Sequence, residues 1–196
     1  WTMQSWEIKE GQTLISTFAN SPMGYALPGA MGAAVAAPGK QIICIDGDGG
    51  IQLNIQEFQT ISHYKLPIKL FILNNRSMGI IKQFQDNYFE GRRYAATPEG
   101  GYSAPDFVKI AQAYGIDAFS IKKPDEMQEA VKKVLAHKGP VVCDVWINEF
   151  QQLIPRIEFV RPLDDMKPYL SDKEFYGNMI VSPVPRQKEK IGWQAV

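Results

Sequence analysis

Residues suited to chemistry gather in two short polar segments, each directly after an apolar run. Gly47-Asp48-Gly49-Gly50 follows the run QIICID, and Asn75 follows the run IKLFIL. Carboxylate and amide oxygens are ligands that Mg²⁺ accepts, usually together with phosphate and water. Glycines let backbone N–H groups approach a phosphate, and a helix N-terminus favours its negative charge. These residue types therefore predict a magnesium ion that holds a diphosphate.

The spacing of the two segments indicates that they belong to one site. Asn75 lies 27 residues after Asp48, which leaves room for one helix and one strand. Ligands of parallel α/β sheets bind at the carboxyl ends of the strands, so both residues are expected at the same rim. An Asp-Gly-x-Gly string alone usually marks a turn, and Asn75 alone could cap one. The presence of both predicted strands favours the metal site.

A non-catalytic nucleotide-binding α/β module is the alternative from a different functional class. A dinucleotide-binding fold would need G-x-G-x-x-G opening a helix and an acidic residue after the second strand. Residues 47–52 read GDGGIQ and lack the third glycine, and the second predicted strand ends in Asn74-Asn75. Both features argue against a dinucleotide site.

The elements that must position these residues alternate between strands and helices. Continuous apolar runs bounded by Gly or Asn are typical of strands that are buried on both faces. We therefore predict an α/β fold with a mostly parallel sheet and helices on both faces. The expected strands are 13–18, 41–46, 68–73, 116–121 and 141–146; the expected helices are 24–37, one that includes Ile55, Phe58 and Ile61, then 78–89, 105–114 and 124–137.

Two further segments are expected to be irregular. Residues 91–104 form a long loop rich in Gly, and long loops in compact domains are often functional. Residues 1–146 are predicted to form one domain, and residues 147–196 an extended C-terminal tail that packs on this domain or on a neighbour. The tail contains five of the 13 prolines and little periodicity.

Composition excludes several classes of protein. The chain has 196 residues, 45% of them apolar, with 21 basic and 21 acidic side chains. A zero net charge argues against a general nucleic-acid binder, which needs a basic face, and no apolar stretch is long enough to span a membrane. Cys44 and Cys143 lie in strand-like runs, which indicates buried thiols and a cytoplasmic, reducing compartment. Two histidines, His63 and His137, are too few for a histidine-built metal site.

The sequence around these motifs resembles a known family. The segments PMGYALPGAMGAAVA, IDGDGGIQLNIQEFQTI, LPIKLFILNN and MGIIKQFQDNYF are similar to the C-terminal, thiamin-diphosphate-binding domain of the acetolactate synthase (acetohydroxyacid synthase) large subunit. The similarity runs from about Asn20 to Trp146. It implies the thiamin-diphosphate-binding fold, with thiamin diphosphate and Mg²⁺ as cofactors. The implied metal ligands are Asp48, Asn75 and the backbone oxygen of Ser77.

The resemblance also assigns roles to neighbouring residues. An apolar side chain at Met23 would hold the cofactor in a bent shape, and backbone near Asn20 and Ser21 would accept from its amino group. Ile80 and Phe84 would line the substrate pocket, although both could equally form one face of an ordinary amphipathic helix. The family keeps Trp where this chain has Phe84, so a preference for 2-ketobutyrate as acceptor is in doubt. The remaining implied cofactor contacts are Gly47, Gly49, Gly50, Met78 and Gly79.

The implied activity is decarboxylation of a 2-keto acid, pyruvate first among them, followed by attack on a second carbonyl, as in branched-chain amino acid biosynthesis. The alternatives within the superfamily are a thiamin-dependent decarboxylase and a sugar-modifying carboligase. GDGG replaces the family's usual GDGS or GDAS, and the tail resembles that of homologues from bacterial surface-sugar gene clusters.

The resemblance further implies partners that this sequence does not contain. The glutamate that activates the cofactor belongs to a pyrimidine-binding domain, and no segment here resembles that domain. We therefore expect no catalytic residue in this chain, and expect it to be one part of a longer enzyme or a subunit that needs a partner. A homodimer or tetramer is expected. FAD in the full-length enzyme would bind outside this domain, and neither nucleic acid nor membrane is an expected partner.

Overall fold

The computed structural model describes residues 1–17, 20–159 and 161–184. Its chain divides after Gln151 into two compact units. The elements of the first unit are α1 (Thr2–Ser5), α2 (Ala26–Ala36), β1 (Ile42–Gly47), α3 (Asp48–Ile51), η1 (Gln52–Glu57), α4 (Phe58–Tyr64), β2 (Ile68–Asn74), α5 (Gly79–Tyr88), α6 (Phe107–Ala113), β3 (Asp117–Ile121), η2 (Pro124–Glu126), α7 (Met127–Ala136) and β4 (Val141–Trp146). No described helix is long and apolar enough to cross a membrane.

The four strands form one parallel sheet in the order β1-β2-β4-β3. Gly47 pairs with Leu73, and Leu73 pairs in turn with Val145. Because the register is level across three strands, their carboxyl ends reach the same rim of the sheet. The residues that follow β1 and β2 therefore begin side by side.

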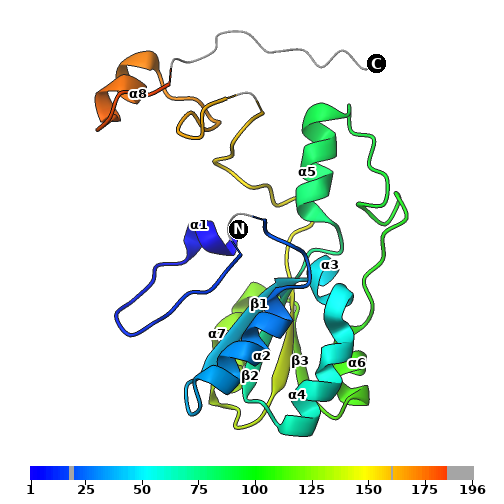
Figure 1. Ribbon diagram of the computed structural model, residues 1–196. Coiled ribbons are helices and arrows are strands. Elements are labelled where there is room, and N and C mark those ends of the chain that lie inside the picture. The colour runs from blue at the N-terminus through cyan, green and yellow to red at the C-terminus, as the bar shows by residue number, and fades with distance from the viewer. Residues whose placement is uncertain (18–19, 160, 185–196) are drawn as a thin grey trace. The chain divides into compact units, whose positions relative to one another are not determined.

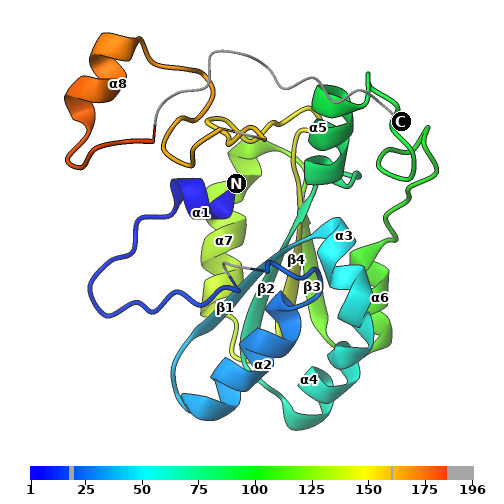
Figure 2. The same ribbon diagram turned by 45° about the horizontal axis from the view of Figure 1, so that its top comes forward.

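Helices pack on both faces of this sheet, as predicted. On one face, α2, α4 and α6 bury apolar side chains such as Leu27, Phe58 and Phe107 against the strands. On the other face, Val134 of α7 packs against Phe71 and neighbouring strand residues. Figures 1 and 2 show α2 and α4 on one side of the sheet and α7 on the other. The α/β fold class is thus confirmed.

Local sequence explains several element boundaries. Helix α4 ends at Lys65, which adopts a left-handed conformation with φ 51° and closes the helix. Helix α6 begins after Asp106, whose carboxylate accepts a hydrogen bond from the Lys109 N–H at 3.1 Å. The prediction that Pro105 is the first helical residue was wrong, because the Asp106 cap starts the helix at Phe107.

The expected strand at 13–18 is also wrong over its described part. Residues 13–17 have no regular structure, and Phe18 lies outside the described residues. A strand exists by pairing with a neighbour, so an apolar, β-branched run is not sufficient. The free edge of β1 pairs with no described strand. Cys44 and Cys143 are free and buried, as predicted.

The second unit contains a helix, so the expectation of a wholly extended tail is wrong. Helix α8 (Asp172–Asn178) begins after Ser171, whose hydroxyl accepts a hydrogen bond from the Glu174 N–H. The same unit holds an ionic cluster in which Glu158 accepts from Arg156 and Tyr169. The packing of residues 147–196 on the domain or on a neighbour stays a prediction.

Candidate cofactor site

A cavity of about 400 Å³ lies at the carboxyl ends of β1 and β2. Ten of the predicted cofactor residues line it: Ser21, Met23, Gly47, Asp48, Gly49, Gly50, Asn75, Ser77, Met78 and Ile80. Three predicted residues, Asn20, Gly79 and Phe84, do not line it. The structure therefore brings together, at one rim, residues from three separate parts of the sequence. Their roles toward a cofactor remain predictions.

Asp48 is the first residue of α3 and is 2% exposed. Its Oδ2 accepts a hydrogen bond of 2.8 Å from the hydroxyl of Tyr102. Burial raises the pKa of Asp48, while the Tyr102 hydrogen bond and backbone N–H groups oppose that rise. Asp48 is thus a buried carboxylate whose hydrogen-bond donors are a neutral hydroxyl and backbone N–H groups. A bound cation would stabilise its negative charge further.

Asn75 is held by a pair of tight side-chain turns. Its Oδ1 accepts from the Ser77 N–H at 3.1 Å, and the Oδ1 of Asn74 accepts from the Arg76 N–H at 3.1 Å. Arg76 has a left-handed φ of 55°, which these hydrogen bonds support. An amide oxygen has two lone pairs, so Asn75 Oδ1 can still serve a metal.

Hydrogen bonds to Asp144 of strand β4 hold this turn in place. Asn74 Nδ2 donates to Asp144 Oδ1 at 2.9 Å, and Trp146 Nε1 donates to Asp144 Oδ2 at 2.9 Å. Both oxygens of the buried Asp144 are thereby occupied. The first asparagine of the Asn-Asn pair is thus structural, and the second lines the cavity.

Two glycines of the first polar segment, Gly49 and Gly50, have other side chains packed where their Cβ atoms would lie. A Cβ on Gly49 would lie 2.4 Å from Met78 Sδ, and a Cβ on Gly50 would lie 2.3 Å from Asp46 Oδ1. Neither distance is sterically allowed without movement. The absence of side chains leaves the backbone of α3 open to the cavity, as a phosphate-binding turn needs.

Three buried polar atoms of residues that line the cavity have no hydrogen-bond partner among the described residues. They are Trp1 Nε1, Asp46 Oδ2 and Ser77 Oγ, and all three are inaccessible to solvent. Burial raises the pKa of Asp46 to about 6, against the opposing effect of the Gly47 N–H. Unpaired buried polar groups are unfavourable unless something binds there.

The set of donors fits a magnesium diphosphate group. It offers one carboxylate from Asp48, one amide oxygen from Asn75 and the backbone of Ser77, beside a glycine turn whose residues line the cavity. Across the part of the chain that the structure describes, no three His, Cys, Asp or Glu side chains cluster closely enough to hold a metal. A hard cation here would therefore depend on mixed oxygen ligands and phosphate.

Met23 lines the cavity, and its side chain, like that of Met78, approaches Gly49. The backbone after it is fixed because Asn54 Nδ2 donates to the Gly24 carbonyl at 2.7 Å. Gly24 has φ 82°, and a Cβ there would lie 2.8 Å from Leu53 and from Asn54. The loop that carries Met23 is therefore held against η1, and the position needs glycine.

Helix α5 carries the two predicted substrate-pocket residues to different places. Ile80 lines the cavity, but Phe84 packs instead with Tyr88 and Phe89, with ring centroids 4.9 and 5.8 Å away. The placement of Phe84 in the substrate pocket stays a prediction that this structure does not support by contact.

Sequence reasoning missed Tyr102, Gln52 and Asp144. Tyr102 lies in the loop 91–104, which was predicted to be functional without naming a residue. Gln52 Nε2 donates to the Asp48 carbonyl at 2.9 Å and to the Tyr102 hydroxyl at 3.1 Å. Asp144 could have been noticed as a carboxylate inside an apolar strand run, because a buried charge needs a partner.

A parallel α/β domain with a carboxylate, an amide and a glycine turn at adjacent strand ends has the features of a domain that binds a diphosphate cofactor. Residues 1–145 match the family model described as thiamine pyrophosphate enzyme, C-terminal TPP binding domain, and the chain belongs to this family. This agrees with the resemblance found from the motifs.

Individual proteins similar to this chain include two acetolactate synthases and a thiamine diphosphate-dependent decarboxylase. The acetolactate synthase large subunit of Porphyra purpurea is 39% identical over 80% of this chain, and acetolactate synthase 1, chloroplastic, of Zea mays is 35% identical over 85%. A solved structure, the Rhodococcus jostii thiamine diphosphate-dependent 4-hydroxybenzoylformate decarboxylase, is 30% identical with a TM-score of 0.57, covering 64% of this chain and 23% of its own. The chain spans about a quarter of the length of these relatives: 26% and 27% of the two synthases.

Proposed function

We propose that this chain is the diphosphate-binding part of an acetolactate synthase-like enzyme that uses thiamin diphosphate and Mg²⁺. The enzyme would decarboxylate a 2-keto acid, pyruvate first, and join the remaining fragment to a second carbonyl. The observation that carries the proposal is the meeting of Asp48 and Asn75 beside the glycine turn at one cavity. The family membership of residues 1–145 supports it.

The residues of this chain would bind and orient the cofactor. Asp48, Asn75 and the Ser77 backbone would hold Mg²⁺, and the open backbone at Gly49 and Gly50 would face the diphosphate. When bound, thiamin diphosphate would supply a carbon nucleophile for the keto carbonyl, and its cationic ring would supply the electron sink for loss of carbon dioxide.

Met23 would set the shape of the bound cofactor. Its side chain reaches the space above Gly49, with Cε 3.5 Å from the position of a Cβ on that glycine. A fixed thioether at that place can act as a support over which a flexible ligand bends. The backbone near Ser21 would accept a hydrogen bond from the amino group of the cofactor, and Asn20, which is exposed, would contribute through its backbone at most.

The rest of the enzyme would complete the site. A pyrimidine-binding domain, from the same protein or from a partner subunit, would bring the glutamate that activates the cofactor. We also propose a homodimer or tetramer in the cytoplasm, with a role in branched-chain amino acid biosynthesis. Any FAD would bind outside this chain.

A second candidate is simple decarboxylation without joining a second substrate. The structural likeness to the Rhodococcus jostii decarboxylase favours it, because that protein shares the same cofactor-binding fold at 30% identity. The residues that separate the two outcomes lie beyond this domain, so the products themselves must distinguish them.

The test is product analysis of the intact enzyme with pyruvate, thiamin diphosphate and Mg²⁺. Formation of acetolactate supports the proposal, and acetaldehyde as the main product favours the second candidate. Absence of turnover, together with absence of thiamin diphosphate binding, would refute both. The 196-residue chain by itself should show no turnover, because the activating glutamate lies elsewhere; robust carbon dioxide release by that chain would contradict the missing-domain argument.

A further inference from the structure

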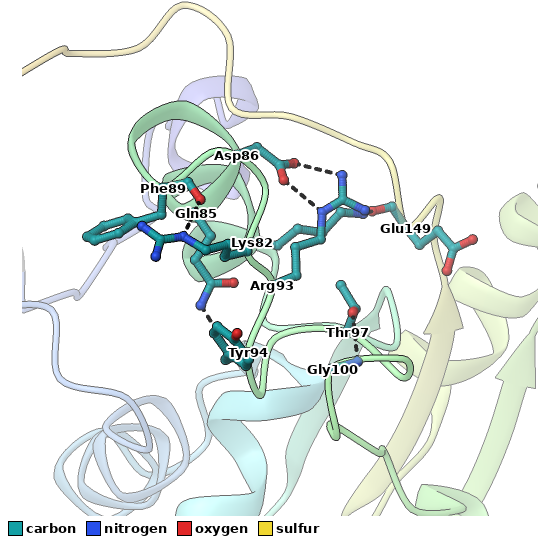
Figure 3. A network of polar contacts seen from close by, with 10 residues as sticks. Lys82, Gln85, Asp86, Phe89, Arg93, Tyr94, Thr97, Gly100 and Glu149 are labelled. Carbon is teal, nitrogen blue, oxygen red and sulfur yellow. Dashed lines mark hydrogen bonds and ion pairs between the residues drawn. The ribbon is translucent and has the colours of Figure 1, made fainter.

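The loop between α5 and α6 is fixed to α5 at its beginning. Arg93 makes a bidentate ion pair with Asp86, with Nε–Oδ1 2.7 Å and Nη2–Oδ2 3.1 Å. Gln85 Nε2 donates to the Tyr94 carbonyl at 3.0 Å. Figure 3 shows both contacts holding the loop against the helix. The first part of this long segment therefore has a defined position despite its lack of regular structure.

The middle of the loop is tied to the candidate cofactor site through its backbone. The Met78 N–H donates to the Ala96 carbonyl at 2.9 Å, directly after Ser77. The turn is closed by a hydrogen bond from the Tyr102 N–H to the Thr97 carbonyl at 2.9 Å. A Cβ on Gly100 would lie 1.9 Å from the Arg93 carbonyl oxygen. The backbone at Gly100 therefore packs directly against the backbone at Arg93.

This packing delivers the Tyr102 hydroxyl to one oxygen of Asp48. The hydroxyl donates to Oδ2 at 2.8 Å and accepts from Gln52 Nε2 at 3.1 Å. Because the Gln52 amide donates to the phenol oxygen, the phenol proton is directed to Asp48. One lone pair of Oδ2 thereby accepts the hydroxyl proton, which fixes the orientation of the Asp48 carboxylate.

We infer that Tyr102 is a positioning residue that disfavours binding of a metal through both oxygens of Asp48, and so makes the site favour Mg²⁺ over larger cations. The inference rests on the proposed function. Mg²⁺ requires near-octahedral geometry at about 2.0–2.1 Å, whereas Ca²⁺ accepts carboxylates through one or both oxygens at about 2.3–2.6 Å. A hydroxyl that holds one oxygen disfavours the two-oxygen mode and leaves the one-oxygen mode intact.

The test is Tyr102→Phe in the intact enzyme, which keeps the ring and removes only the hydroxyl. Calorimetric titration with thiamin diphosphate at graded Mg²⁺ and, separately, graded Ca²⁺ gives a half-saturating concentration for each metal. The Mg²⁺ value is expected to rise about 10–100-fold, as for other groups that orient a metal ligand. The Ca²⁺ value is expected to rise less, so the preference for Mg²⁺ falls. Tyr94→Phe is the matched control, since Tyr94 belongs to the same loop and is exposed.

Two results would overturn the inference: an unchanged Mg²⁺ requirement in Tyr102→Phe, or equal losses for both metals. The unmodified enzyme separates this inference from the proposed function, because failure of that enzyme to bind thiamin diphosphate with Mg²⁺ removes both. Gln52→Met, which removes the donor to the phenol oxygen, provides a second variant. It should shift the metal preference in the same direction by a smaller factor, and no shift in a folded Gln52→Met would also count against the inference.

Discussion

The two ends of the sheet differ in whether a buried polar group has a hydrogen-bond partner. At the amino end, Lys69 is buried and its Nζ donates to the carbonyls of His137 and Gly139. At the carboxyl end, Asp46 Oδ2 and Ser77 Oγ are buried without a partner among the described residues. The same sheet thus carries a satisfied charge at one end and unsatisfied polar atoms at the other. The difference indicates that the amino end serves stability and the carboxyl end serves binding.

The largest expected effect is at the carboxyl end. Asp48→Ala and Asn75→Ala should each weaken Mg²⁺-dependent thiamin diphosphate binding about 100-fold or more, since removal of a ligand exceeds the effect of removing a group that orients it. The fold without cofactor should stay largely intact, because removal of the desolvated Asp48 charge offsets the loss of its hydrogen bond from Tyr102. Calorimetry measures both. Asp125→Ala, an exposed carboxylate at the start of η2, is the control. Full cofactor affinity in both site variants would disprove the metal assignment.

The next effect is at the amino end and has the reverse pattern. Lys69→Met should lower the free energy of unfolding by about 2 kcal/mol, because it removes the ammonium that donates to two partly buried carbonyls. Thiamin diphosphate affinity of the folded enzyme should stay the same. Chemical denaturation measures the first quantity and calorimetry the second. Lys40→Met, at an exposed lysine before β1, should change neither. Loss of cofactor affinity in Lys69→Met would contradict the inference that the amino end serves stability and the carboxyl end serves binding.

The next prediction compares substitutions at two glycines, and its expected effects are smaller than those above. Gly49→Ala adds a methyl group 2.4 Å from Met78 Sδ, and such overpacking costs about 1–3 kcal/mol. Cofactor affinity should fall about 10-fold or more. Gly32→Ala lies in α2, where nothing stands within 4 Å of the new Cβ, and should raise stability by about 0.5–1 kcal/mol. Denaturation and binding curves for the pair check both values; equal behaviour of the two variants would mean that the glycine turn has no special role.

The smallest expected effect concerns how far the binding region extends along α5. Phe84 packs on Tyr88 and Phe89 rather than at the cavity, so Phe84→Trp should raise the ratio of acetohydroxybutyrate to acetolactate by less than about 10-fold, the lower limit for one methylene in an apolar pocket. Competition between pyruvate and 2-ketobutyrate with both products quantified gives the ratio. An unchanged ratio would remove Phe84 from the substrate pocket.

The sequence was most informative where one local pattern has one structural meaning. The runs before Asp48 and Asn75 are apolar on both faces, and such runs occur almost only in parallel strands covered by helices. The two site residues could therefore be placed at one rim from the order of strands and helices alone. The match of β1 to Ile42–Gly47 and of β2 to Ile68–Asn74 reflects this.

The failures came from contacts that no local pattern encodes. Tyr102 meets Asp48 across 54 positions of sequence, and only the folded loop 91–104 brings them together. The segment 13–17 has the composition of a strand but pairs with no described neighbour. Helix α8 is a different case, because Ser171 and Glu174 already have the spacing of a helix start, and the proline content of the surrounding segment obscured it.

The strand order also constrains how the chain can fold as it is made. β4 lies between β2 and β3 in the sheet, yet it is the last of these strands in the sequence. β3 consequently has no partner until residues 141–146 are synthesised, and Asn74 has no Asp144 to hold it. Pairing of distant segments is slow and leaves strand edges exposed in the meantime. A nascent chain stopped before Val141 would therefore leave unpaired the edges of β2 and β3 that β4 joins in the folded domain, which makes it a target for chaperones and for aggregation.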